Sequence, residues 1–283
     1  MSGQELSPGQ EIDGLERELL RAARGGDREA LTALLERHQQ RVFGFGMKMC
    51  GDAEDAKDVA QETLLTMART LRDFRGEASL STWLYTVARS FCIKKHRRTK
   101  GAPAAHESLD EIPQASSDQQ APSPEQMLLG REARETVAAA LDQLEPEARE
   151  VVILRDIEGL SAAEAAQVTG LSVAAVKSRL HRARQALRLH LVEVVGGEAM
   201  AAASPSCPDV LTMLSRKLED EISPNVCAEM ERHVADCPHC RGLCDSLKRT
   251  LAMCKALPTP AVPMDVQESL RKAVSVALAA NAR

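Results

Sequence analysis

Helical periodicity is the feature that most constrains how this chain can fold. In residues 51–71, GDAEDAKDVAQETLLTMARTL, mostly apolar side chains recur every three or four positions, so they share one side of a helix: Ala56, Val59, Ala60, Thr63, Leu64, Met67 and Leu71. Asp52 precedes them as a suitable N-cap. The chain has one Trp, one Tyr and four Phe, and β-branched alternation is scarce. We therefore predict an all-α protein.

Changes in composition divide the chain into modules. Residues 100–125 combine Pro, Ser, Gln and acids with almost nothing apolar to bury, which predicts a flexible linker. We expect one small helical domain before it, at 14–99, and a second after it, at 126–195. A cysteine-rich helical domain follows at 205–257. Residues 258–283 are expected to be a tail with a Pro-rich spacer and a short amphipathic helix.

The distribution of apolar residues and cysteines indicates the compartment. No apolar run approaches the roughly 18 to 20 residues that span a bilayer, and the N-terminus has no apolar signal core. We therefore expect a cytoplasmic protein with no membrane partner. In that reducing compartment the eight cysteines should be thiols or metal ligands rather than structural disulfides. Six of them lie between Cys207 and Cys254.

The net charge of -5 hides two basic segments that contain no acid. The first carries Arg89, Lys94, Lys95, Arg97, Arg98 and Lys100. The second carries Lys177, Arg179, Arg182, Arg184 and Arg188. Each could be a solvated helix face that also suits the helix dipole. Two such segments at the ends of predicted helices favour contact with phosphates.

The second basic segment belongs to a helix-turn-helix pattern. Ser161 and Glu164 form a capping box for a short helix that ends at Gly170, and Ser172 caps the basic helix after it. A plain helical hairpin would not need so basic a second helix. A helix-turn-helix places the start of its second helix in the major groove, so the candidates for DNA contact are Ser172, Ala174, Ala175, Lys177, Ser178, Arg179 and Arg182.

Several segments, in order, resemble the extracytoplasmic-function class of bacterial sigma factors. They are DAEDAKDVAQETLLTMART, FRGEASLSTWLYTVARSFCIKKHRR, the Pro-rich linker, and LEPEAREVVILRDIEGLSAAEAAQVTGLSVAAVKSRLHRAR, which together cover roughly residues 20–190. The resemblance implies a promoter-melting helical bundle and a helix-turn-helix domain joined by the linker. It also implies core RNA polymerase and promoter DNA as partners, with no small-molecule substrate and no catalytic role.

The resemblance also implies roles for individual residues. The acidic helix should dock on the clamp coiled coil of RNA polymerase through Asp55, Asp58, Gln61 and Glu62. The turn and helix at 74–98 should melt and read the minus-ten element, and the helix-turn-helix should read the minus-thirty-five element. Single-stranded bases need a cationic track, for which the candidates are Arg89, Lys94, Lys95, Arg97 and Arg98. Trp83 and Tyr85 offer rings for stacking, although Trp83 lies in an apolar stripe that favours a core position.

The motif H-x3-C-x2-C near the carboxyl end predicts a metal site formed by His233, Cys237 and Cys240. Pro238 disfavours helical geometry at Cys237, so a helix should end there and CPHC should form a knuckle. A closed tetrahedral zinc site needs a fourth ligand, for which Cys207 is a good candidate. This segment resembles the zinc-binding domains of anti-sigma factors, in which an upstream Cys or His joins the same motif.

Three further thiols belong to the same region. Cys227 and Cys244 could approach the primary site and are also candidate ligands, whereas a buried apolar stripe would explain Cys244 and Cys254 equally well. Soft thiolates favour zinc, copper(I) or cadmium. The whole chain resembles a subgroup of these sigma factors in which a fused cysteine-rich tail makes transcription metal-dependent. We therefore hypothesise that metal binding in 207–254 switches promoter or polymerase binding.

Three alternatives use the same residues differently. The tail could be a redox sensor with a structural zinc, in which oxidation pairs a ligand with a spare thiol and expels the metal. The chain could be a helix-turn-helix repressor with a zinc-stabilised domain, but this leaves the first helical block unexplained. CPHC also resembles the C-x-x-C motif of thiol oxidoreductases, which usually lies between a strand and a helix, a context that is absent here. We therefore expect no enzyme activity.

Overall fold

The structure is a computed structural model that describes residues 8–99, 124–195, 204–257, 261–269 and 271–272. Every regular element in these ranges is helical, which confirms the predicted all-α class. The chain divides into a first unit, Met1–Ser116 with Thr259–Arg283, and a second unit, Ser117–Pro258. No helix among the described residues is both long and apolar enough to cross a bilayer.

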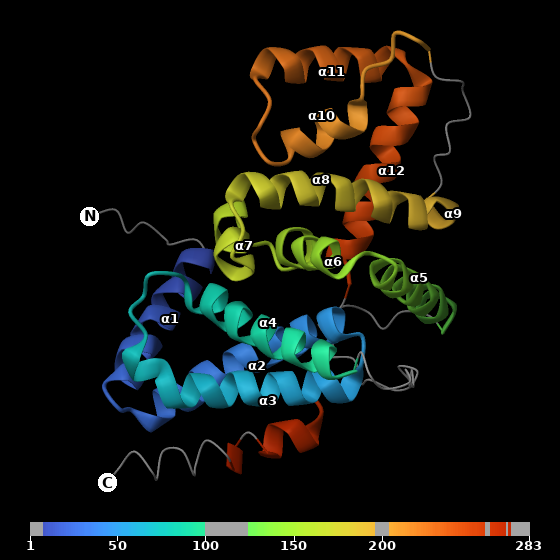
Figure 1. The fold of residues 1–283 in the computed structure, drawn as a ribbon. Helices are drawn as coiled ribbons and strands as arrows, with labels where there is room; N and C mark the ends of the chain where they lie inside the picture. The colour runs from blue at the N-terminus through green and yellow to red at the C-terminus, as the bar shows by residue number, and fades with distance from the viewer. Residues whose placement is uncertain (1–7, 100–123, 196–203, 258–260, 270, 273–283) are drawn as a thin grey trace. The chain divides into compact units, whose positions relative to one another are not determined.

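The first unit is a bundle in which α2, α3 and α4 all pack on one another (Figure 1). Its elements are α1 (Pro8–Arg24), α2 (Arg28–Cys50), α3 (Ala53–Thr70), the short 3-10 helix η1 (Leu71–Asp73) and α4 (Leu80–Thr99). The core contains the fully buried side chains of Phe43, Phe45 and Leu64. These helices are separated by turns of a few residues, so neighbouring helices can pack closely.

Local capping sets the junction between α2 and α3. Gly51 ends α2 with φ 70°, a left-handed conformation that glycine adopts without strain. Asp52 then caps α3, because its side chain accepts a hydrogen bond of 2.8 Å from the backbone N–H of Asp55. The predicted N-cap is therefore confirmed. The two helices approach so closely that a Cβ atom on Gly46 would lie 3.2 Å from the Cα atom of Ala56.

The second unit contains the helix-turn-helix. Its first elements are α5 (Pro124–Asp142), α6 (Pro146–Val152), a π-helical turn η2 (Ile153–Ile157), α7 (Ala162–Thr169), α8 (Val173–His190) and α9 (Val192–Val195). Ser161 and Glu164 form the predicted capping box, and Ser172 caps α8 as predicted. The π-helical turn was not predicted. It buries Ile153 and Leu154 and allows Arg155 and Asp156 to reach partners outside α6.

The cysteine-rich segment, residues 204–257, packs on the helix-turn-helix within the second unit. It forms α10 (Val210–Lys217), α11 (Pro224–Asp236) and α12 (Pro238–Lys255). Both α10 and α12 contact α8, and α12 also reaches η2 (Figure 1). The domains predicted at 126–195 and 205–257 thus lie in one compact unit.

The remaining predictions concern the linker and the tail. The predicted linker lies outside the described residues, except for its last two positions at the start of α5. Part of the tail belongs to the first unit and contains a helical turn at 264–269. Val262 and Val266 are buried there, and the Asp265 carboxylate lies 3.7 Å from the Lys57 ammonium group of α3.

The contact at Gly46 yields a stability prediction. Gly46→Ala would press a methyl group against the backbone of Ala56, which should lower the free energy of unfolding of the first unit by about 1–3 kcal/mol. Gly14→Ala is the matched control, because it changes a helical glycine that has nothing within 4 Å of the added Cβ atom. Thermal unfolding of both variants measures the difference. Equal melting temperatures would contradict close packing of α2 on α3.

Candidate metal centre and nucleic-acid interface

Four predicted ligands converge in the cysteine-rich segment, and we call this set the metal centre: Cys207, His233, Cys237 and Cys240. Their ligand atoms all lie within 4.8 Å of one another. The sulfurs of Cys207 and Cys237 are 3.8 Å apart, and the His233 Nε2 atom is 3.2 Å from the Cys240 sulfur. Zn–S bonds of about 2.3 Å in a tetrahedron place two sulfurs about 3.8 Å apart, so this donor set fits zinc.

The junction between α11 and α12 brings three of these ligands together. As predicted, α11 ends at Asp236, and Cys237 is extended with φ -106° and ψ 109°. Its backbone N–H still donates to the His233 carbonyl at 2.9 Å, which keeps the imidazole close to the thiol. Pro238 then opens α12, so Cys240 lies in the first turn of that helix.

The two thiols of the CPHC sequence differ in their proton affinity. The backbone N–H of Cys240 donates to the Cys237 sulfur and lowers the pKa of Cys237. Burial raises the pKa of Cys240 to about 12. The pKa values of the two CPHC thiols are therefore shifted in opposite directions.

The other candidate ligands lie outside this cluster. Cys227 lies in the first part of α11, where its sulfur is 3.5 Å from the Glu231 carboxylate. Cys244 is buried in an apolar cluster with Leu214 and Leu247, and burial raises its pKa. Cys254 is 0% exposed, and burial raises its pKa to about 12. These surroundings favour the interpretation of Cys244 and Cys254 as core residues.

The predicted major-groove residues have different surroundings on α8. Ser172, Ala174, Ser178 and Arg182 are exposed, whereas Ala175 and Arg179 are half-buried. Lys177 is engaged by the cysteine-rich segment: its Nζ atom donates to the Glu219 carbonyl at 2.9 Å and lies 3.4 Å from the Glu221 carboxylate. Lys177 is therefore held by protein groups in this structure.

A buried ion-pair network lies beside Lys177. Glu219 is 6% exposed and accepts hydrogen bonds from Arg184 at 2.9 Å and from Arg155 at 2.6 Å. Arg184 also donates to Asp156 and to the Ser215 side chain. Burial opposes the charge of Arg184, but hydrogen bonding to Asp156 and the nearby charge of that carboxylate raise its pKa. This network could not be predicted from the sequence, because nothing in KLEDEIS distinguishes Glu219 from its neighbours.

The first unit places its two sets of candidates in contact. On α3, Asp55 and Gln61 are half-buried, while Asp58 and Glu62 are exposed. The Lys95 ammonium group of α4 donates to Asp55 at 2.9 Å and also to Asp58. A predicted DNA contact therefore pairs with two predicted polymerase contacts.

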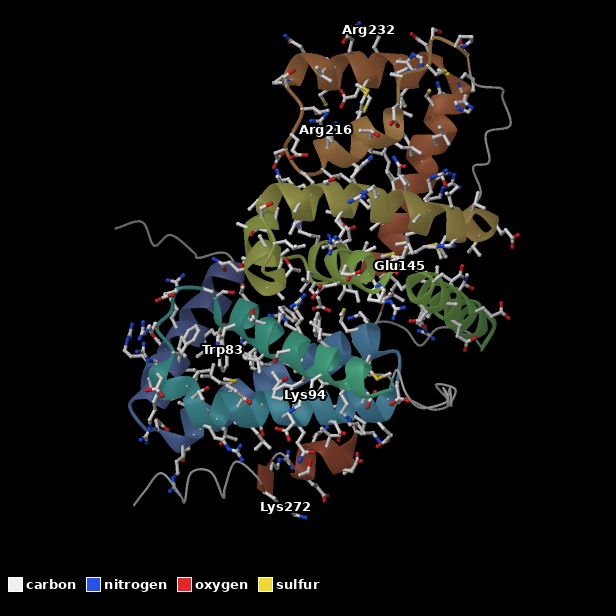
Figure 2. All side chains as sticks on the ribbon, in the orientation of Figure 1. Trp83, Lys94, Glu145, Arg216, Arg232 and Lys272 are labelled. Carbon is white, nitrogen blue, oxygen red and sulfur yellow. The ribbon has the colours of Figure 1, made fainter. Side chains whose placement is uncertain are left out.

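The other minus-ten candidates of α4 differ in exposure. Lys94 is exposed and Arg89 is half-buried, while the side chains of Arg97 and Arg98 lie outside the described residues (Figure 2). Trp83 is half-buried against Phe74, with ring centroids 5.8 Å apart. Tyr85 is 2% exposed and packs on Phe45, so its ring belongs to the core and is not presented for stacking on bases.

Comparisons with known proteins agree with this arrangement. Sigma-70 region 2 matches residues 34–101, sigma-70 region 4 matches 134–187, and a zinc-finger family matches 207–241. The RNA polymerase sigma-H factor of Pseudomonas aeruginosa is 31% identical over 61% of this chain and 91% of its own length. The chain belongs to the extracytoplasmic-function sigma factors. As a member of this family, it directs RNA polymerase to promoters.

Other similar proteins include a second sigma factor and two solved structures. The extracytoplasmic-function sigma factor SigE of Mycolicibacterium smegmatis is 31% identical over 62% of this chain and 68% of that protein. Among solved structures, CnrH in complex with the cytosolic domain of CnrY is 28% identical, covers 64% of this chain and 99% of its own, and has a TM-score of 0.44. The sigma factor RpoE in complex with the anti-sigma factor NepR from Bartonella quintana is 24% identical, with coverage of 58% and 96% and a TM-score of 0.44.

The matched regions locate the candidate sites in the sigma factor. Region 2 includes α3 and α4 with both sets of candidates, and region 4 includes most of α8. The zinc-finger match contains all four residues of the metal centre, whereas Cys244 and Cys254 lie beyond it. The sigma factor thus carries its metal centre on a segment that packs against region 4.

Metal content tests the ligand assignment. The full-length sigma factor with Cys237→Ser should lose stoichiometric zinc, because a closed site would keep only three protein ligands. Cys227→Ser is the matched control, since it replaces a half-buried thiol that lies outside the cluster, and it should keep the metal. Elemental analysis of the purified proteins measures both. Zinc retained by Cys237→Ser, or lost equally from both variants, would contradict the assignment.

Proposed function

We propose that this sigma factor is controlled in cis by a metal ion bound at the metal centre. The observation that carries this proposal is the packing of α10 and α12 on the predicted promoter-reading helix α8. Cys207 lies just before α10, and Cys240 lies in the first turn of α12. Regions 2 and 4 would engage core RNA polymerase and promoter DNA. The cysteine-rich segment would determine whether α8 of region 4 can contact that DNA.

The positions of the ligands explain how a cation would affect α10. Cys207 lies just before α10, whose N-cap is Asp209, whereas the other three ligands surround the junction of α11 and α12. A bound cation would tie the start of α10 to this junction. Because metal binding stabilises the arrangement in which its ligands are gathered, it would fix the position of α10 relative to α12.

The far end of α10 carries the contact with region 4. Glu219 lies two positions after the last residue of α10. Its carboxylate lies between Arg184 and Arg155, and its carbonyl accepts a hydrogen bond from Lys177. A shift of α10 would therefore move Glu219, break this network and release Lys177 toward DNA. Two positions of α10 with different affinities for metal would form the switch, since a ligand shifts an equilibrium only by its differential affinity.

The donor set also indicates the class of metal. Three thiolates and one imidazole are typical of structural zinc sites with four protein ligands. Copper(I) and cadmium are the other thiophilic ions that such donors favour. We propose zinc as the resident ion, with copper and cadmium as the competitors to be tested.

Run-off transcription tests this control directly. Full-length sigma factor, stripped of metal or loaded with zinc, copper(I) or cadmium, is added to core RNA polymerase with promoter fragments that the holoenzyme selects from genomic DNA. Transcript yield should change between the stripped protein and at least one loaded form, because the ion alters how region 4 is presented. The same titration with Cys237→Ser should give a flat response.

Two results would count against the proposal at different levels. Equal transcript yields in every metal state would contradict control by the metal and would indicate a sigma factor with a purely structural metal site. Absence of specific transcripts in all states would contradict the assignment of regions 2 and 4 as a working promoter reader.

The Glu219 network predicts a variant in which metal binding no longer changes the transcript yield. Glu219→Gln removes the buried charge between two guanidinium groups, so the ratio of transcript yields between metal-loaded and stripped protein should move toward one. Loss of one member of a buried ion pair should also lower the free energy of unfolding by about 3 kcal/mol. Glu229→Gln, on the exposed face of α11, is the matched control and should keep the wild-type ratio. An unchanged ratio in Glu219→Gln would show that control does not pass through this contact.

A further inference from the structure

A second thiol pair lies in region 2 and does not belong to the cysteine-rich segment. Cys50 is the last residue of α2, and Cys92 lies in the second half of α4. Their sulfur atoms are 2.9 Å apart, and neither residue forms a disulfide. The packing of α2 on α4 brings together two residues that are 42 positions apart in the sequence. This pair has no place in the metal centre or in the promoter contacts assigned above.

The two thiols differ in their access to solvent. Cys50 is partly exposed at the end of its helix, whereas Cys92 is 1% exposed in the core between the helices. An oxidant dissolved in water can therefore reach the Cys50 sulfur first. The Cys92 sulfur is already in contact with it and is shielded from other reagents. This combination of an accessible thiol and an adjacent resolving thiol is typical of redox-sensing pairs.

We propose that Cys50 and Cys92 form a reversible oxidation site that takes hydrogen peroxide as its oxidant. The Cys50 thiol loses its proton, and the thiolate attacks one peroxide oxygen. The O–O bond breaks, Cys50 becomes a sulfenic acid, and the leaving hydroxide takes up that proton to form one water. The Cys92 sulfur then attacks the Cys50 sulfur, the S–O bond breaks, and the oxygen leaves as a second water with the Cys92 proton. Two thiols and one peroxide thus give one disulfide and two waters, and the two sulfurs supply the two electrons.

Reduction follows the ordinary route of thiol–disulfide exchange. A dithiol of the reducing compartment attacks the exposed Cys50 sulfur, forms a mixed disulfide and releases the Cys92 thiolate, which takes up a proton. The dithiol then closes its own disulfide and releases Cys50. A transient bond of this kind is compatible with a compartment in which structural disulfides are rare.

The location of the pair gives the bond a consequence for region 2. Cys50 directly precedes the turn that leads into α3, and Cys92 lies three residues before Lys95, which pairs with acids of α3. A disulfide would join the end of α2, just before the predicted polymerase-binding helix α3, to the predicted minus-ten helix α4. Because the bond closes a long loop, it should restrict the unfolded chain and raise the melting temperature of region 2.

Peptide mapping tests the site in the full-length, zinc-loaded protein. After treatment with hydrogen peroxide, alkylation and trypsin digestion without reductant, residues 49–57 and 90–94 should appear as one cross-linked species, lighter by two hydrogen atoms than the two peptides together. Dithiothreitol should restore the separate peptides. The oxidised wild-type protein should melt at a higher temperature, and Cys50→Ser should show neither the cross-link nor the shift.

Controls separate this site from the metal centre. Cys227→Ser removes another half-buried thiol and should keep the cross-link, and zinc content measured in the same samples shows whether the metal centre has also been oxidised. A Cys50 that accumulates as sulfinic acid without the cross-link would overturn the proposal. A Cys50 that cross-links mainly to cysteines of residues 207–254 would overturn it too. Loss of zinc together with the 50–92 cross-link would support the proposal and would show that the metal centre is oxidised as well.

Discussion

The arrangement of the second unit depends on a carboxylate that is buried among cations. Glu219 lies between Arg184 and Arg155, and Asp156 shares Arg184 with it. Removing these charges from water costs several kcal/mol for each ion, and the network offsets this cost only while all partners are in place. The interface between α10 and α8 is therefore stable only in the arrangement that pairs all of these charged groups. Each of its charged groups would be well solvated if the helices separated, so the interface can open.

The two helices that cover α8 are held differently. α12 carries fully buried side chains along its length, including Leu247 and Cys254, and it contacts both α8 and η2. Apolar surface of this kind gains nothing from exposure to water. α10 instead meets α8 through Arg184, Lys177 and a contact between the Thr212 hydroxyl and His181 at 3.0 Å. Val210 and Leu214 of α10 share an apolar cluster with Leu247 of α12, so the polar contacts of α10 with α8 are the ones that can open.

The features that could be predicted from the sequence are those decided within a few residues. The caps at Asp52, Ser161 and Ser172 and the helix end at Cys237 depend on neighbours at most four positions away, and the structure confirms them. The H-x3-C-x2-C spacing similarly brings three ligand atoms together, and Cys207 joins them from 26 positions upstream of His233.

Features that depend on partners far away in the sequence could not be predicted in this way. Lys177 and Arg184 belong to one basic segment of the sequence, yet each contacts acidic or carbonyl groups more than 25 positions away. Their charges therefore do not face solvent as the exposed Arg182 side chain does. Cys50 and Cys92 lack any motif, because their meeting follows from helix packing rather than from spacing. Cysteine number alone likewise could not separate the half-buried thiol of Cys237 from the core thiol of Cys254.

The two predicted DNA-contact lysines that are held by protein groups lead to different expectations for binding. Lys95 pairs with Asp55 and Asp58 near the protein surface, where such pairs contribute only about 0–1 kcal/mol, so polymerase or DNA can displace them locally. Lys177 is held by the backbone carbonyl of Glu219, whose side chain is itself buried in the network. Freeing Lys177 therefore requires that α10 moves with its network. We therefore expect region 2 to engage its partners by exchanging surface ion pairs, whereas full exposure of the predicted promoter-reading helix α8 requires a change in the cysteine-rich segment.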